Sequence, residues 1–222
     1  MEYPETKKLD IREEIFGQSI EDPYRWLEDF NSIESTAWVE SQNNLTNKYL
    51  SNPFQKTIKK DLEQIWDSEQ ISIPYRKRNK TFYFLNDGNQ QQSVFMMKRC
   101  DKCVPEVLLD PNSFSKDGTV SLSEISISPD GKKLAYSISD GGSDWRTWKV
   151  MDIETKQDLA DMIEWSKFSY ATWESDSSGF YYQKYDETEE SLADINRSPK
   201  LYFHKLSDNQ FEDRLIYQNL EN

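Results

Sequence analysis

Three stretches of this chain repeat one pattern of short apolar strands and tight turns, and this repeat constrains the fold more than any other feature. The middle copy is the clearest, with the strand-like segments EISIS, KKLAYSIS, RTWKVMDI and DLADMIEW. Similar units lie about fifty residues before it and about forty-five residues after it, a period typical of repeat architectures. Each unit therefore predicts four antiparallel strands, which is one blade of a β-propeller.

The turns of the units support the same interpretation. SPDG at 128–131 and SDSSG at 175–179 occupy the same place in successive units, and they carry the Asp, Ser and Gly residues that tight hairpins need. We expect the polar, acidic stretch 186–196 to be an exposed loop. Because three blades cannot close a ring, the chain is expected to be part of a larger protein.

Before the repeats, the apolar residues follow helical spacing. Asn52 and Pro53, followed by Gln55, predict a helix start with an N-cap, a proline at the first position and a capping-box partner. The apolar side chains after this cap share one helical face: Phe54, Ile58, Leu62, Ile65 and Trp66. The pattern changes to strands near residue 71. We therefore predict a mainly β chain with two domains, a helical segment over 1–70 and blades over 71–222.

Charge and hydropathy exclude several classes of partner. The formal net charge is −13, so nucleic acid and anionic membrane surfaces would repel the chain. The one basic run, residues 76–80, lies between two strand-like segments and is interpreted as a solvated turn. No apolar run is long enough to span a membrane. The amino terminus shows no secretory leader, and two cysteines are too few for a disulfide scaffold, so we expect a cytoplasmic location.

The residue types that carry catalysis are scarce. No Gly-x-Ser-x-Gly nucleophile motif occurs, and the loop GGSD at 141–144 has the wrong spacing for one. The single histidine, His204, lies in a strand-like segment, where a structural role is expected. Cys100 and Cys103 have the spacing of half a zinc site, but no second ligand pair exists. We therefore predict no metal, no cofactor and no catalytic residue within the chain.

An ordered series of motifs changes this picture. The segment DPYRWLE at 22–28 resembles the amino terminus of the prolyl oligopeptidase family of serine peptidases. The likeness continues along nearly the whole chain in the family's order, through VESQN (39–43), FYF (82–84), LDPN (109–112), DGTV (117–120), SDW (143–145) and KFS (167–169). Each motif alone is weak, and the order makes the resemblance specific.

The resemblance implies a fold and an activity. Members pair an α/β-hydrolase peptidase domain with a seven-bladed propeller, and the peptidase domain begins with a helical segment that precedes the propeller. The chain would then hold that segment and about three blades of an incomplete propeller. The whole protein would be a monomeric serine endopeptidase that cleaves proline-containing oligopeptides after proline, with the propeller as a size filter. The serine, aspartate and histidine would lie in the missing carboxy-terminal hydrolase part.

One substrate contact carries over from the family. The phenylalanine of its Lys-Phe-Ser stretch lines the outer substrate pocket, and the matching residue is Phe168. A buried aromatic in a blade core is the other interpretation of Phe168, and the sequence leaves both open. For the whole chain, the alternative function is a non-catalytic propeller that only binds a partner.

Overall fold

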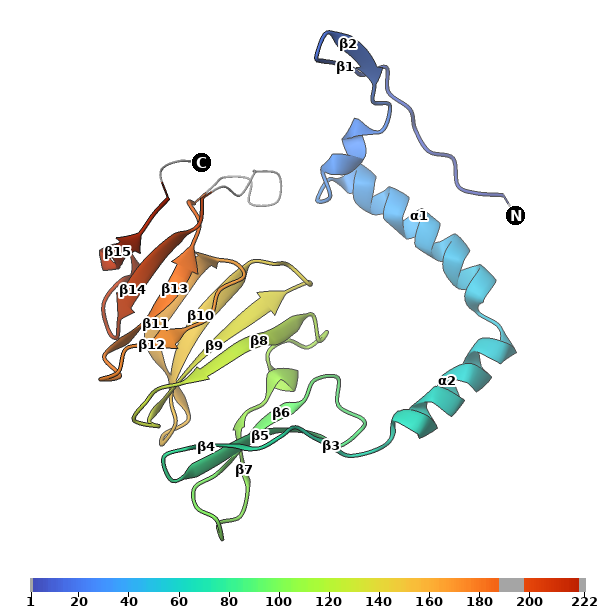
Figure 1. The fold of residues 1–222 in the computed structure, drawn as a ribbon. Helices are drawn as coiled ribbons and strands as arrows, with labels where there is room; N and C mark the ends of the chain where they lie inside the picture. Colours follow the sequence, from blue (N-terminus) through green and yellow to red (C-terminus); the bar gives the residue numbers. More distant parts are fainter. Residues whose placement is uncertain (1, 188–197, 220–222) are drawn as a thin grey trace. The chain divides into compact units, whose positions relative to one another are not determined.

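The computed structural model describes residues 2–187 and 198–219, and the chain divides into two compact units, Met1–Trp66 and Asp67–Asn222. Figure 1 shows helices in the first unit and sheets in the second. Most of the acidic stretch 186–196, predicted to be an exposed loop, lies outside the described residues. Within the described ranges, no helix is long and apolar enough to cross a membrane.

The first unit contains strands as well as helices. Its elements are β1 (Arg12–Ile15), β2 (Gln18–Glu21), η1 (Arg25–Glu28), α1 (Ile33–Leu50) and α2 (Pro53–Trp66). The β1–β2 hairpin corrects the expectation that residues 1–70 are helical throughout. Phe16 and Gly17 form its turn with φ values of 51° and 77°, as a two-residue primed turn requires. The dipeptide Phe-Gly differs from the Asn-Gly and Asp-Gly pairs that usually mark such turns. The sequence therefore did not predict this hairpin.

Side-chain caps fix where both α-helices begin. Ser32 Oγ accepts a hydrogen bond from Ser35 N at 3.1 Å at the start of α1. At α2, Asn52 Oδ1 accepts one from Gln55 N at 3.0 Å, directly before Pro53. The predicted N-cap is confirmed. The apolar face of α2 remains exposed in this unit, since Phe54, Ile65 and Trp66 keep about two-thirds or more of their surface.

The described residues of the second unit form three antiparallel sheets, which we name the first, second and third blades (Figure 1). The first blade contains β3 (Gln70–Ile71), β4 (Tyr75–Lys77), β5 (Lys80–Asn86), β6 (Val94–Lys98) and β7 (Glu106–Leu109). The 3-10 helix η2 (Pro111–Ser113) leads to the second blade, with β8 (Val120–Ile127), β9 (Lys133–Asp140), β10 (Arg146–Asp152) and β11 (Gln157–Ser166). This arrangement confirms the predicted fold class.

The third blade contains β12 (Thr172–Trp173), β13 (Gly179–Lys184), β14 (Lys200–Lys205) and β15 (Arg214–Tyr217), with the 3-10 helix η3 (Gln210–Glu212) before β15. The sequence predicts its first strand over 167–174, but only two residues of that stretch form one. Phe168 has a left-handed backbone (φ 49°), which cannot continue a β-strand. The chain therefore turns before it pairs with β13.

The second blade is buried on both faces. On β9, Leu134 and Tyr136 belong to an apolar core shared with the first blade, while Ala135 between them belongs to a core shared with the third. On β10, Trp148 and Val150 enter that second core. Successive side chains of a strand point to opposite faces, so both faces carry apolar residues. This explains why the strands lack the apolar-polar alternation of a half-exposed sheet.

Equivalent turns of successive blades are hydrogen-bonded to one another. Arg78 Nε donates to Pro129 O at 2.9 Å, and Asp130 N donates to Ser177 Oγ at 3.1 Å. Arg78, Gly131 and Ser177 have φ values of 57°, 71° and 63° in the β4–β5, β8–β9 and β12–β13 turns. Because each of the three turns contains a residue with positive φ and hydrogen bonds join the turns across the blades, the repeat seen in the sequence is also a repeat of contacts.

The aromatic core between the second and third blades generates the first prediction. Phe180 is fully buried, and its ring centroid lies 5.3 Å from that of Trp173 and 5.6 Å from that of His204. We expect Phe180→Ala to lower the free energy of unfolding by about 3–5 kcal/mol, because it leaves a cavity. Urea unfolding of the 222-residue chain measures this. Phe211→Ala is the control, since this side chain is 83% exposed and should change stability by less than about 0.5 kcal/mol.

Candidate functional site

The candidate substrate residue, Phe168, lies just beyond the end of β11 and is 60% exposed. Its neighbours in sequence, Lys167 and Ser169, are buried. A ring exposed to this extent is not a member of a blade core in this structure. The Phe168 side chain is therefore accessible to solvent just after the last strand of the second blade.

The segment that carries Phe168 has an unusual backbone. Trp165 and Phe168 have φ values of 58° and 49°, in the left-handed region that costs L-residues about 1–2 kcal/mol each. Lys167, between them, places its ammonium 3.8 Å from the centroid of the Trp145 ring. A cation over an indole face is attracted by the ring quadrupole, most strongly where water is excluded. This buried contact is one of the interactions that hold the segment in its strained conformation.

Hydrogen bonds to β13 hold both ends of the same segment. Ser169 Oγ accepts from Gln183 N at 2.8 Å, and Ser166 Oγ donates to Gln183 O at 2.8 Å. Tyr185 N donates to Trp165 O at 2.9 Å. Since these bonds flank Phe168 on either side, they restrain the backbone that carries its ring.

An aromatic hollow lies at the same end of the second blade. Trp145 meets Trp165 edge to face, with centroids 5.4 Å apart, and it meets Tyr185 in the same way at 6.1 Å. The hollow has a volume of about 400 Å³, and Trp145, Arg146 and Trp165 are among its lining residues. The sequence indicates Trp145 only within the motif SDW and does not predict this aromatic group. No sequence signal marks Trp165, because left-handed backbone is normally signalled by Gly or Asn.

The hollow offers apolar surface and a few charges, and its described lining residues include no nucleophile paired with a base. Ser143, in the β9–β10 turn, accepts a hydrogen bond on Oγ from Trp145 N and receives another on its carbonyl from Ser139 Oγ. Ser143 therefore stabilises the turn. This agrees with the spacing of residues 141–144, which does not match a nucleophile motif. The arrangement supports binding of an apolar group rather than a chemical step.

His204 is buried and bonded to carboxylates. Its ring nitrogens lie 2.7 Å from Asp213 Oδ1 and 3.1 Å from Asp161 Oδ1. Burial lowers the pKa of His204, but the hydrogen bonds and charges of the two aspartates outweigh it and raise the pKa to about 9. Because both nitrogens face carboxylates, His204 has none left to act as a base for a serine. The structure thus places it in a structural role, as predicted.

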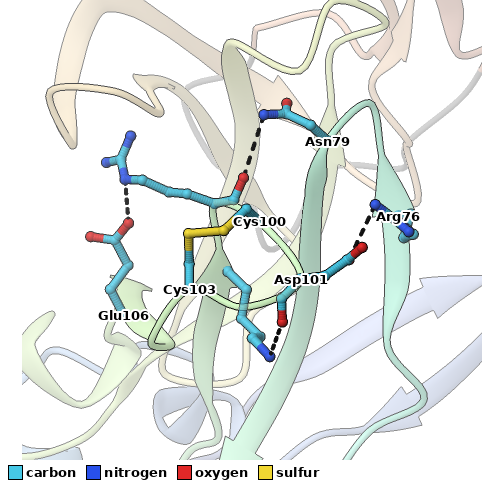
Figure 2. Close-up of a disulfide and its surroundings, with 8 residues drawn as sticks. Arg76, Asn79, Cys100, Asp101, Cys103 and Glu106 are labelled. Carbon is cyan, nitrogen blue, oxygen red and sulfur yellow. Dashed lines mark hydrogen bonds and ion pairs between the residues drawn. A yellow bond between two sulfur atoms is a disulfide. The ribbon is translucent and has the colours of Figure 1, made fainter.

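The cysteines form a disulfide within the turn between β6 and β7 (Figure 2). This pairing was not anticipated, although the turn itself was. Asp101, between the cysteines, pairs with Arg76 at 3.2 Å and accepts on its carbonyl from Lys98. The bond closes a four-residue loop, so it constrains one turn and does not cross-link the blades. In the described ranges, no group of three His, Cys, Asp or Glu residues could hold a metal ion.

The basic run 76–80 is used inside the fold. Lys80 is buried, and its ammonium lies 2.9 Å from Glu154 and donates to Gly131 O at 3.3 Å. Arg78 binds Pro129, as described above. Two of the basic residues therefore fasten the first blade to the second. This corrects the interpretation of the whole run as a solvated turn, because the docking surface was invisible in the sequence.

Blades of this kind preceded by a helical unit define a protein of the β-propeller class. A family model described as "Prolyl oligopeptidase, N-terminal beta-propeller domain" matches residues 3–222. The chain belongs to the prolyl oligopeptidase family. This confirms the resemblance inferred from the ordered motifs.

Named relatives agree with the family match. The chain is 42% identical to a prolyl endopeptidase of Elizabethkingia miricola over 219 residues, which cover 97% of the chain and 31% of that protein. It is 32% identical to prolyl oligopeptidase A of Amanita bisporigera, covering 99% of the chain and 33% of that protein. The chain thus spans about a third of the length of the curated relatives it matches.

Solved structures match over the same part. One, from a study of two prolyl endopeptidases and their inter-domain dynamics, has a TM-score of 0.87 at 27% identity and covers 99% of this chain and 33% of that one. Prolyl oligopeptidase B from Galerina marginata, bound to a 35mer hydrolysis and macrocyclization substrate, has a TM-score of 0.79 at 28% identity, with 99% and 34% covered.

The left-handed backbone at Phe168 generates a second prediction. We expect Phe168→Gly to raise the free energy of unfolding by up to about 1 kcal/mol, because glycine adopts positive φ without the steric cost. The matched control is Tyr170→Gly, at a residue that is 70% exposed and has no positive φ, and it should destabilise. Urea titrations of both variants measure the difference. A loss of several kcal/mol for Phe168→Gly would show that the ring belongs to a core.

Proposed function

We propose that this chain is the amino-terminal third of a serine endopeptidase that hydrolyses short peptides after proline. The observation that carries the proposal is the family match over residues 3–222, together with relatives named prolyl endopeptidase at 42–43% identity. The solved relative with a bound 35mer supports peptides as the substrate class. The coverage of about a third of each relative leaves room for a catalytic domain in the whole protein.

The chemistry would be acyl transfer. A serine would attack the carbonyl carbon of the proline residue, a histidine would take the serine proton and pass it to the leaving amine, and an oxyanion hole would bind the developing charge. A water molecule would then hydrolyse the acyl-enzyme and free the serine. We place all these groups outside the present chain. His204 supports this division, since both of its ring nitrogens are bonded to carboxylates in a fully buried place.

The two units would have separate tasks. The exposed apolar face of α2 would pack on the remainder of the hydrolase domain, because a helix with such a face needs a partner to bury it. The blades would cover the active site and restrict entry to oligopeptides. The blades pack face to face and their turns are hydrogen-bonded, and this packing supports a wall that would exclude folded proteins. A monomeric state and a cytoplasmic location remain predictions.

The first test concerns where the catalytic groups lie. We expect the product of the full-length reading frame to hydrolyse a proline-linked chromogenic peptide, and the pure 222-residue chain to show no turnover, because triad residues act as a unit. The frame itself should encode a downstream Gly-x-Ser-x-Gly followed by Asp and His. Turnover by the 222-residue chain would contradict this division. A natural stop codon after residue 222 would instead favour a non-catalytic binding module.

The second test concerns Phe168 in the full-length protein. If its exposed ring contacts substrate upstream of the cleaved bond, Phe168→Ala removes about 1–3 kcal/mol of apolar contact, a tenfold to hundredfold loss in kcat/KM for long peptides. Short substrates that do not reach the ring should be affected little. Tyr170→Ala serves as the control for a neighbouring exposed ring. Equal losses on short and long peptides would retire the pocket assignment.

A further inference from the structure

His204 has no part in the proposed reaction, yet it is fully buried between carboxylates from two blades. Asp161 lies on β11 of the second blade, and Asp213 directly precedes β15 of the third. The distances are 3.1 Å from Nε2 to Asp161 Oδ1 and 2.7 Å from Nδ1 to Asp213 Oδ1. Both aspartate side chains are 1% exposed. A buried cluster of charges therefore crosses the boundary between the blades.

The geometry specifies the protonation state. A carboxylate oxygen only accepts hydrogen bonds, so each ring nitrogen of His204 must carry a hydrogen, which is the imidazolium form. A neutral ring would present a lone pair to one carboxylate. Burying two carboxylates beside a neutral ring would also leave the cluster without its one positive charge, which is costly in a low dielectric.

Other contacts hold the aspartates but do not replace the histidine. The Tyr182 hydroxyl donates to Asp213 Oδ2 at 2.6 Å, and Ser207 N donates to Asp161 Oδ1 at 2.6 Å. Asp161 Oδ2 is buried, and no hydrogen-bond partner for it was found among the described residues. His204 therefore supplies the positive charge that compensates the Asp161 carboxylate, and hydrogen bonds from His204 and Ser207 fix the position of that carboxylate.

We propose that protonated His204 is a latch between the second and third blades, and that loss of its proton at alkaline pH releases the segment 206–209 from β11. This segment carries Ser207, which shares Asp161 Oδ1 with His204 of β14. The next residue, Gln210, is held on β11 by hydrogen bonds with the backbone of Glu164 at 3.0 and 3.1 Å. Those amide contacts do not titrate, so they keep the release local.

The electrostatics give the pH range. Burial lowers the pKa of His204, the two aspartates raise it, and the net value of about 9 exceeds the ordinary 6.5. The imidazolium contribution to stability is therefore complete below about pH 6.5 and is lost as pH rises through about 9. Burial and Asp213 raise the pKa of Tyr182, so its hydroxyl keeps its proton through this range. Burial also acts to raise the pKa of Asp161, but hydrogen bonds from His204 and Ser207 lower it overall.

The chain offers a direct measurement, because His204 is its only histidine. The imidazole carbon-proton signal of the untagged 222-residue chain can be followed by NMR from about pH 5 to about pH 10.5. We expect a midpoint about two pH units or more above the ordinary 6.5. Asp213→Asn should lower the midpoint, and Phe211→Ala, a change at an exposed neighbour, should leave it unchanged. A midpoint at or below 6.5 in the folded chain would overturn the proposal.

Release of the segment has its own readout in the unmutated chain. The Ser207 amide, bound to Asp161, should lose hydrogen-exchange protection above about pH 9 relative to the Gly131 amide, bound to Ser128 O in the turn between β8 and β9. Parallel protection of both amides up to pH 10 would show that no latch opens. His204→Gln, if it folds, should remove the pH dependence of the ratio between the two amides.

Discussion

The second blade must bury two apolar faces, and this requirement organises the packing of the whole second unit. The side chains of β9 alternate between two cores, with Leu134 and Tyr136 on one side and Ala135 on the other. A single blade could satisfy neither face, so stability arises from stacking neighbours, as in other repeat proteins. The turns then come into register, and hydrogen bonds such as Asp130 N to Ser177 Oγ follow from the same stacking.

The candidate substrate contact depends on that packing. The left-handed backbone of Phe168 is held by contacts of its two neighbours. The Lys167 ammonium lies over the Trp145 ring, and Ser169 accepts a hydrogen bond from Gln183 on β13. The strain is sustained by buried contacts around it, as is common where a side chain is presented to a ligand. The exposed ring is thus a product of the junction between the second and third blades rather than of its own sequence context.

Polar groups at the blade boundaries supply what apolar packing lacks, which is a definite register. Lys80 with Glu154 joins the first blade to the second, and His204 with Asp161 joins the second to the third. Charges in such places stabilise only when paired, and removing one partner leaves an uncompensated buried group. The boundary between the second and third blades, which carries an imidazolium, therefore responds to pH through an identifiable side chain, while the apolar cores on either side do not.

The sequence by itself determined the repeat, the antiparallel blades, the cap at Asn52 and, through the order of its motifs, the family. These features rest on local periodicity and turn chemistry, which neighbouring residues encode. Tertiary structure alone decided that Phe168 is exposed, that Lys80 is buried and that His204 lies between two aspartates. Each outcome depends on residues roughly ten to seventy positions away in the chain, brought together only when two blades stack. No local pattern records such a contact, so the fold was readable in advance and the environment of its key side chains was not.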